Sequence, residues 1–366
     1  MLLLKAICHR HQCRPQHNKE NNIMITSSEN SSLDTNLAKS NFSIEMNGTM
    51  FSMLSKNVYN DIILAPMREW STNAVDACLA ADTEVKFDVM LPTAESPTFS
   101  VRDYGTGLAE EEVTTLFATF GASTKRDSNK FNGTFGIGRM SALAYTTQFS
   151  VETFLDGTHS TFLVTTQDSI PQMIKLGSTT TTENNGLKLS LSVEPRDIDK
   201  FIRKAKKLYK YFDHKPTLNV SLDLSLPRGI QGTNWFIDDS GTYSSPVAVM
   251  GNVAYEIDTN YVKIPYSHII EVPLGALSIT PGRETLNYDD TTIETLQKFD
   301  KLIAAETEQV LTTALNNVKK DSYKEVSEFC RNVRGKVNYQ MASKVAKNLT
   351  VPHKYFQMHQ YCLELL

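Results

Sequence analysis

Three polar residues of segment 66–80 (PMREWSTNAVDACLA) stand at positions i, i+4 and i+7: Glu69, Asn73 and Asp76. In a helix they share one face. A carboxylate and an amide oxygen one turn apart suit a hard cation that keeps several waters and also binds phosphate oxygens, which is magnesium chemistry. The carboxylate nearer the phosphates could orient or deprotonate a water. For this segment alone, a solvated polar face on a surface helix is the competing interpretation.

Two glycine clusters follow, at residues 103–107 (DYGTG) and 133–138 (GTFGIG), with the polar triplet 123–125 (STK) between them. Glycines lack Cβ and adopt positive φ, so a ligand can lie against bare backbone. Backbone N–H groups turned toward one point bind anions, and a helix beginning after Gly138 would add its positive end. The pattern predicts a phosphate site, although ordinary turns explain either cluster taken alone.

The commonest phosphate loops are absent. No segment reads G-x-x-x-x-G-K-[ST], and neither cluster reads G-x-G-x-x-G. A phosphate site of another kind is therefore expected.

The elements that would position these residues follow from periodicity. Segment 66–80 has a proline suited to a first helical turn and an apolar stripe at helical spacing. Segments 85–90 and 98–102 alternate as strands, and the second delivers Asp103 at its end. A short helix over 109–119 and a glycine-containing lid over 120–134 come next.

Further strands are predicted at 149–154, 160–164 and 187–193, and they complete an antiparallel sheet with helices on one face, an α+β fold. A second domain begins after Lys215, with strands at 218–220, 247–250, 253–255 and 269–272. Thr291 to Glu294 reads as a capping box that opens a long helix. The predicted domains are a flexible leader (1–38), a first domain (39–214), a second domain (215–320) and a C-terminal helical segment (321–366).

These elements together resemble the GHKL ATPases, the superfamily of gyrase, the large heat-shock chaperone, histidine kinases and MutL. The match consists of E-x-x-x-N-x-x-D on a helix, D-x-G-x-G, an S-T-K lid and G-x-x-G-x-G, in this order. A later segment, 275–286 (GALSITPGRETL), is similar to the chaperone's S-R-E segment. Across 43–296 the chain is most similar to the RIIA lysis-inhibitor proteins of T-even-like bacteriophages. The resemblance implies a GHKL (Bergerat) sandwich followed by a transducer-like α/β domain, with ATP and Mg2+ as cofactors.

The resemblance implies catalytic roles for Glu69, as general base, and Arg283, which would sense the γ-phosphate from the second domain. Asn73 would ligate magnesium. The implied nucleotide contacts are Asn73, Asp76, Asp103, Gly105, Gly107, Leu108, Ser123, Thr124, Lys125, Thr134, Phe135, Gly136, Ile137 and Gly138.

Among these, Asp103 would accept the adenine amino group, and the glycines at 105 and 107 would let the backbone pass under the base. Lys125 would face phosphate from the lid, and residues 136–138 would donate N–H groups. One departure from the family concerns the pocket threonine. Residues 185–187 (NGL) offer none beside the glycine, although Thr182 is near in sequence.

The composition limits which partners and which cellular compartment we expect for this protein. With 366 residues and 40% hydrophobic residues, the chain can hold two cores. A net charge of −4 argues against nucleic acid as a partner. Five scattered cysteines indicate free thiols in a reducing compartment, hence the cytoplasm, that of the host bacterium if a phage encodes the chain. No apolar run approaches the roughly 20 residues of a spanning helix.

Segment 198–212 carries apolar residues at helical spacing among lysines and arginine. A basic amphipathic helix can lie on a membrane, which would give peripheral membrane contact. The plainer interpretation is a helix that covers the sheet and keeps its lysines in water.

The leading hypothesis is a slow, Mg-ATP-dependent switch or clamp with two domains that close on the nucleotide, forming a homodimer that ATP could drive and acting on an unknown protein partner. If RIIA-like, it would affect lysis or prophage exclusion. The alternatives are a scaffold that binds ATP without turnover and a chaperone-like ATPase of cellular origin. A histidine kinase is disfavoured because no H-E-x-x-x-P-type segment occurs.

Overall fold

The computed structural model describes residues 58–118, 138–167, 170–240, 244–318, 325 and 328–329. Contacts group Met46–Leu366 into one compact unit; the other, Met1–Glu45, lies outside the described residues. The predictions for the leader, for the lid at 120–134 and for nearly all of 321–366 also lie outside them.

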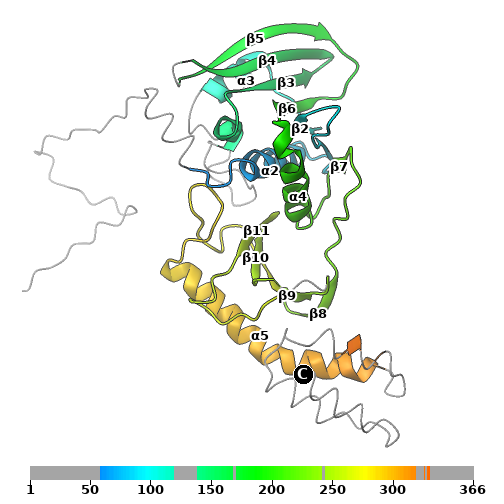
Figure 1. Cartoon of the computed structure of the whole chain (residues 1–366), viewed down its shortest axis with the longest axis vertical. Helices are drawn as coiled ribbons and strands as arrows, with labels where there is room; N and C mark the ends of the chain where they lie inside the picture. Colours follow the sequence, from blue (N-terminus) through cyan, green and yellow to red (C-terminus); the bar gives the residue numbers. More distant parts are fainter. Residues whose placement is uncertain are drawn as a thin grey trace, which may run out of the picture. The chain divides into compact units, whose positions relative to one another are not determined.

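A seven-stranded sheet dominates the first part of the unit (Figure 1). Its strands are β1 (Phe87–Met90), β2 (Thr98–Asp103), β3 (Gln148–Leu155), β4 (Thr158–Gln167), β5 (Ile170–Thr180), β6 (Gly186–Ser192) and β7 (Thr217–Leu218). Their order is β5-β4-β3-β6-β2-β1-β7. All neighbours are antiparallel except β1 and β7. The predicted α+β fold with a largely antiparallel sheet is confirmed.

The helices of this part are α2 (Leu64–Ala80), α3 (Glu110–Ala118), α4 (Ile198–Tyr209) and two 3-10 elements, η1 (Gly138–Ala144) and η2 (Pro195–Asp197). Helix α2 packs on β1, β2 and β6, and η1 and α4 flank it on the same side of the sheet (Figure 1). Trp70 anchors it, because its ring stacks on Phe99 at 5.9 Å and meets Phe149 at 5.7 Å between centroids. The apolar stripe read from the sequence is thus the face that joins α2 to the sheet.

Helix α4 covers the sheet, as the plainer of the two interpretations predicted. Phe201, Ala205 and Tyr209 are buried in the first core. Two of its lysines form ion pairs: Lys204 with Asp61, and Lys200 with Asp197 at 2.7 Å. Arg203 and Lys206 are exposed, so the basic face of this helix is partly paired with carboxylates and partly in contact with solvent.

Two strands differ from expectation. β5 has no predicted counterpart, because it is an edge strand exposed along nearly its whole length and lacks the alternation that a buried face imposes. β7 was assigned to the second domain, which is wrong: it pairs with β1 in the first sheet. Asn219, directly after β7, extends this pairing to Leu91, directly after β1. Its side chain accepts the Leu91 N–H at 2.7 Å and donates to the Leu91 carbonyl at 2.9 Å.

A five-stranded sheet follows, in the order β11-β10-β12-β9-β8. Its strands are β8 (Arg228–Gly232), β9 (Trp235–Asp238), β10 (Val247–Met250), β11 (Val253–Glu256) and β12 (His268–Val272). The β8–β9 hairpin was not predicted, because the glycines at 229 and 232 interrupt the alternation of apolar and polar residues. The long helix α5 (Asp290–Asn317) buries Leu296 and Ile303 in the core of this second sheet.

The predicted capping box at Thr291 does not cap α5. Asp289 does so instead, by accepting the Thr292 N–H at 2.9 Å. Aspartate is among the strongest N-cap residues and stands two positions earlier. Thr292 then accepts the Ser278 N–H at 2.9 Å, which fastens the preceding loop to the helix.

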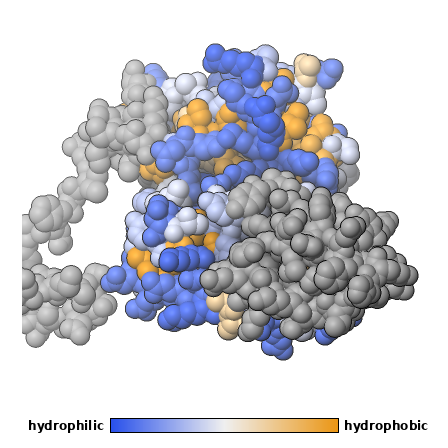
Figure 2. Space-filling model, turned by 60° about the horizontal axis from the view of Figure 1, so that its bottom comes forward, coloured by the Kyte–Doolittle hydropathy of each residue, from blue (hydrophilic) through white to orange (hydrophobic). Residues whose placement is uncertain are grey.

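The surface shown in Figure 2 is mostly hydrophilic, with hydrophobic residues in separate groups. The large exposed hydrophobic side chains include Ile170, Ile174 and Leu176 on β5. Within the described ranges, no helix combines the length and apolar character that crossing a bilayer requires.

Candidate functional site

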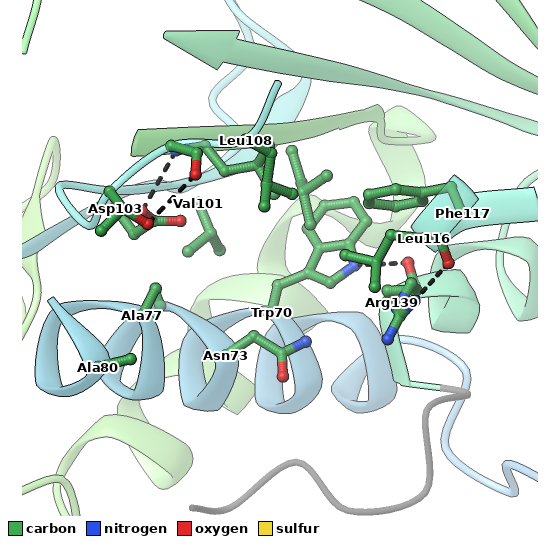
Figure 3. A pocket seen from close by; sticks show the side chains of 15 residues that line it. Trp70, Asn73, Ala77, Ala80, Val101, Asp103, Leu108, Leu116, Phe117 and Arg139 are labelled. Carbon is green, nitrogen blue, oxygen red and sulfur yellow. Dashed lines mark hydrogen bonds between the residues drawn. The ribbon is translucent and has the colours of Figure 1, made fainter. Parts of the chain in front are cut away.

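A cavity of about 260 Å3 lies between α2 and the first sheet. Its lining comes from α2, β2, the turn after β2, α3, β6 and Arg139 of η1. Figure 3 shows Asp103 at one end and Arg139 at the other, with Trp70 between them and Asn73 projecting from α2. The cavity is mainly apolar along its length and carries opposite charges at its two ends.

The acidic end is built by the turn after β2. One carboxylate oxygen of Asp103 accepts the backbone N–H of Gly105 at 2.9 Å and that of Leu187 at 3.2 Å. Gly107 has φ +75°, and a Cβ there would overlap the Phe154 carbonyl, so this position requires glycine. The turn is therefore fixed against both β6 and β3, and it holds the carboxylate at the cavity wall.

A threonine that the sequence analysis did not single out holds the next residue of this turn. The Leu108 N–H donates to Thr153 Oγ1 at 3.1 Å, and that hydroxyl donates back to the Leu108 carbonyl at 2.6 Å. Thr153 lies on β3, opposite Leu187 in register. Thr182, noted for its place in the sequence, is exposed.

Arg102 stabilises the backbone at Asp103. Its guanidinium donates to the carbonyl of Asp103 and, at 2.6 Å, to that of Asn184. The guanidinium lies 4.1 Å from the ring centroid of Phe154 and 4.8 Å from that of Tyr104. Burial lowers the pKa of Arg102. These hydrogen bonds connect the end of β2 to the turn before β6.

Arg139 forms the basic end. Its carbonyl accepts the Trp70 indole N–H at 3.3 Å, and its guanidinium donates to the Leu116 carbonyl. Burial lowers the pKa of Arg139 to about 10, so it stays cationic at neutral pH. The predicted helix after Gly138 is the short 3-10 element η1, and Arg139 rather than a long helix supplies the positive charge.

Glu69 lies beside the cavity in a buried ion-pair cluster. Its carboxylate pairs with Arg68 Nε at 3.1 Å and with Arg283 Nη1 at 3.0 Å. Arg68 Nη2 also donates to the Gly282 carbonyl at 2.5 Å. Burial alone would raise the pKa of the Glu69 carboxyl, but Arg283 and Arg68 outweigh it and hold that pKa below its usual range. Glu69 is therefore ionised at neutral pH, the protonation state that a general base needs.

Arg283 reaches Glu69 from 214 residues away. It has φ +55°, an uncommon conformation for a residue with a side chain. Burial would lower the pKa of Arg283, but Glu69 and Tyr255 raise it. The ion pair fastens the loop before α5 to helix α2.

The site residues predicted from the sequence divide into three groups. Asn73, Asp103, Gly107 and Leu108 line the cavity. The second group lies close by without lining it: Glu69 pairs with Arg283, Asp76 is fully buried on α2, and Gly105 and Gly138 lie so close to Ala77 and Glu69 that a Cβ would crowd them. Ser123, Thr124, Lys125, Thr134, Phe135, Gly136 and Ile137 lie outside the described residues.

The residues that were not predicted from the sequence are mostly buried or half-buried charges and their partners, such as Arg68, Arg102 and Arg139. A buried arginine cannot be told from a surface one by local pattern. All three arginines stand next to a residue that was singled out, and this adjacency was the available signal.

Gly138 lies against Glu69 with no room for a side chain, because a Cβ there would overlap the Oε2 atom of Glu69. Replacing Gly138 with Ala is expected to displace the carboxylate from Arg283 and to lower the free energy of unfolding by about 1–3 kcal/mol. Urea unfolding measures this. Gly177→Ala is the matched control, since nothing lies within 4 Å of a Cβ there. Equal effects at the two positions would contradict the assigned contact.

The donor set fits magnesium held mainly by phosphate. Among the described residues, no group of three or more His, Cys, Asp or Glu side chains could hold a metal ion. Magnesium in phosphate sites takes only one or two protein ligands and keeps waters. Asn73 lines the cavity, so its amide oxygen would be one protein ligand for a magnesium ion bound there together with phosphate.

Residues 68–193 match the family model described as histidine kinase-, DNA gyrase B- and HSP90-like ATPase. The match begins in α2 and ends just after β6, so it contains the cavity. This segment is thus similar to the ATPase domains that the model describes. No curated protein sequence matches the chain.

Two solved structures of the ATPase region of Saccharomyces cerevisiae topoisomerase II are similar to this chain. One, bound to ICRF-187 (dexrazoxane), has 14% identity and a TM-score of 0.45, and covers 68% of this chain and 86% of that one. The other has 13% identity and a TM-score of 0.46, and covers 69% and 85%.

Proposed function

We propose that this chain binds Mg-ATP in the cavity between α2 and the first sheet and hydrolyses it slowly, as a conformational switch. The observation that carries the proposal is the arrangement of the cavity. It has a carboxylate fixed by two backbone N–H groups at one end, apolar walls, and a half-buried arginine at the other. This matches a purine with an exocyclic amino group at one end and a phosphate chain at the other.

The proposed roles follow from these positions. Asp103 accepts the adenine amino group, and Asn73 offers its amide oxygen to magnesium. The ion, when bound, neutralises phosphate charge. Arg139 faces the phosphates together with the predicted contacts at 123–125 and 134–138. Glu69 orients or deprotonates the attacking water.

The ion pairs of Glu69 support a switch. A carboxylate that accepts from two guanidinium groups has little capacity left for a water proton. Arg283 must leave Glu69 before it can reach a γ-phosphate, and the same movement leaves the Oε2 atom of Glu69 available to a water while Arg68 still pairs with Oε1. Turnover would then require a second conformation, in which the loop carrying Arg283 has moved.

The same ion pairs favour a second candidate, a scaffold that binds ATP without turnover. If Arg283 never leaves Glu69, nucleotide is held but not cleaved. Single-turnover hydrolysis of radiolabelled ATP by the full chain separates the two. Cleavage of the bound ATP supports the ATPase, and bound ATP that stays intact supports the scaffold.

Asp103→Asn is expected to weaken ATP binding by more than about tenfold, or about 1.4 kcal/mol, because an amide group can turn a donor toward the adenine amino group. Calorimetric titration with ATP measures the change. Asp88→Asn is the matched control, since Asp88 accepts the Tyr104 hydroxyl at 2.5 Å and does not line the cavity. Unchanged affinity in Asp103→Asn would rule out the assigned base contact.

Finer proposals rest on the motif order that resembles the RIIA proteins. We propose that the chain acts in the cytoplasm of an infected bacterium, affects lysis or prophage exclusion, and forms a homodimer when ATP is bound. Size-exclusion chromatography with and without a non-hydrolysable ATP analogue tests the dimer. Lysis timing in cells infected with phage lacking the gene tests the biological role.

A further inference from the structure

A second cavity, of about 310 Å3, lies at the junction of α2, α4, the β10–β11 hairpin and the loop at 283–285. It is of similar size to the candidate nucleotide cavity, and the proposed ATPase function assigns it no ligand, although Arg283 on its wall takes part in that function.

The two cavities lie on opposite sides of α2. Leu64 and Arg68 line the second cavity and stand one turn apart, so they share a helix face. Asn73 and Ala77 line the first cavity, and at about 100° per residue their directions lie about 140° to 180° from that of Arg68. Helix α2 therefore separates the two cavities, and a ligand in one does not occupy the other.

Most of the second cavity's wall is apolar. Leu208 and Tyr211 come from α4 and the residues after it. Val247, Val253 and Ala254 come from the hairpin. Such a wall suits a small molecule with an apolar body.

The polar end of the second cavity contains two buried guanidinium groups. Arg68 and Arg283 are 2% and 6% exposed and share the single carboxylate of Glu69. Arg283 Nε is buried and has no hydrogen-bond partner within the part of the chain that the structure describes. A buried N–H of a charged group that lacks an acceptor is costly, so an incoming oxygen acceptor would be stabilised there.

The other charged groups on the wall already have partners. Lys204 pairs with Asp61, and Lys207 pairs with Glu256 at 2.9 Å. Glu284 accepts the backbone N–H groups of residues 60 and 61, at 2.9 and 2.8 Å. The unmet hydrogen-bonding capacity is thus at the guanidinium of Arg283.

We propose that this cavity is a second ligand site, which takes a small amphipathic carboxylate. The carboxylate accepts from Arg283 Nε and shares the two guanidinium groups with Glu69. The apolar body lies against the hairpin and α4.

Calorimetry of the full chain without nucleotide tests the site, with sodium octanoate as the probe. Octan-1-ol has the same apolar body without the charge, and acetate has the charge without the body. Octanoate is expected to bind at least about tenfold more tightly than either. Equal affinities for octanoate and octan-1-ol, or no heat from octanoate, would overturn the proposal.

Ala254→Phe fills the cavity from β11 without changing a charge, and it is expected to weaken octanoate binding by about tenfold or more. Ala304→Phe is the matched control, because Ala304 is exposed on α5. If Ala254→Phe does not fold, Arg283→Lys decides, since it keeps the charge and removes Nε. Octanoate affinity unchanged in the deciding variant would show that the probe binds elsewhere.

Occupancy has a consequence that rests on the proposed ATPase function. Arg283 held by a ligand on this side of α2 cannot move to a nucleotide, so octanoate is expected to slow ATP turnover by at least about twofold. ATP titrations of the same samples keep the two proposals apart. Heat from ATP without heat from octanoate overturns only the second site, and the reverse overturns only the nucleotide site.

Discussion

Glu69→Gln is expected to lower the single-turnover rate of ATP hydrolysis by about 10²- to 10⁴-fold, while ATP affinity changes by less than about threefold. The amide is a poor proton acceptor but has nearly the size of the carboxylate. It also leaves an oxygen for one of the two arginines that pair with Glu69. Alanine would leave both buried guanidinium groups without an acceptor, and the resulting instability would obscure the effect on catalysis.

Glu271→Gln serves as the control for this substitution. Glu271 pairs with Arg228 on the surface, where its side chain is 42% exposed, so its amide should leave both binding and turnover unchanged. Loss of ATP affinity in parallel with the rate in Glu69→Gln would contradict the role of Glu69 as a base. An unchanged rate would exclude that role.

Arg283→Met is expected to lower the free energy of unfolding by about 3 kcal/mol at neutral pH. Removing one partner of a buried ion pair leaves an incompletely compensated charge, which costs about 3–5 kcal/mol, and the remaining contact with Arg68 favours the lower end. Guanidinium or urea unfolding at pH 7 measures it. At a pH low enough to protonate Glu69 the difference should shrink, because the ion pair no longer contributes.

Arg228→Met provides the comparison, since the pair of Arg228 and Glu271 is exposed on both sides (49% and 42%). An exposed pair contributes about 0–1 kcal/mol. A loss of similar size in the two variants would mean that the buried pair is no stronger than a surface contact. The fastening of the loop to α2 would then be weak.

Periodicity alone predicted the elements that hold Glu69, Asn73 and Asp103. The apolar stripe around Trp70 identified α2 and its polar face, and alternation identified β2 up to the residue where it ends. These features depend on residues close in sequence, and burial on one face enforces them. The order of the motifs supplied the rest of the predicted site.

What escaped prediction depends on distant contacts. The pairing of Glu69 with Arg283 spans 214 residues, and neither local sequence shows that both side chains are buried. Thr153 supports the turn after β2 only because β3 lies beside β6 in the sheet. The exposed edge strand β5 has no buried face to impose a pattern.

The length of α5 has a mechanical consequence. Its 28 residues span about 42 Å, and its first turn is fastened by Thr292 to the loop that carries Arg283. Leu286 of that loop and Leu296 of the helix share one core, so the two reorient together. A tilt of about 10° at the Glu69 contact would sweep the far end of the helix through about 7 Å. In the proposed switch, the breaking of one ion pair would thus displace the far end of the helix by more than one helical turn.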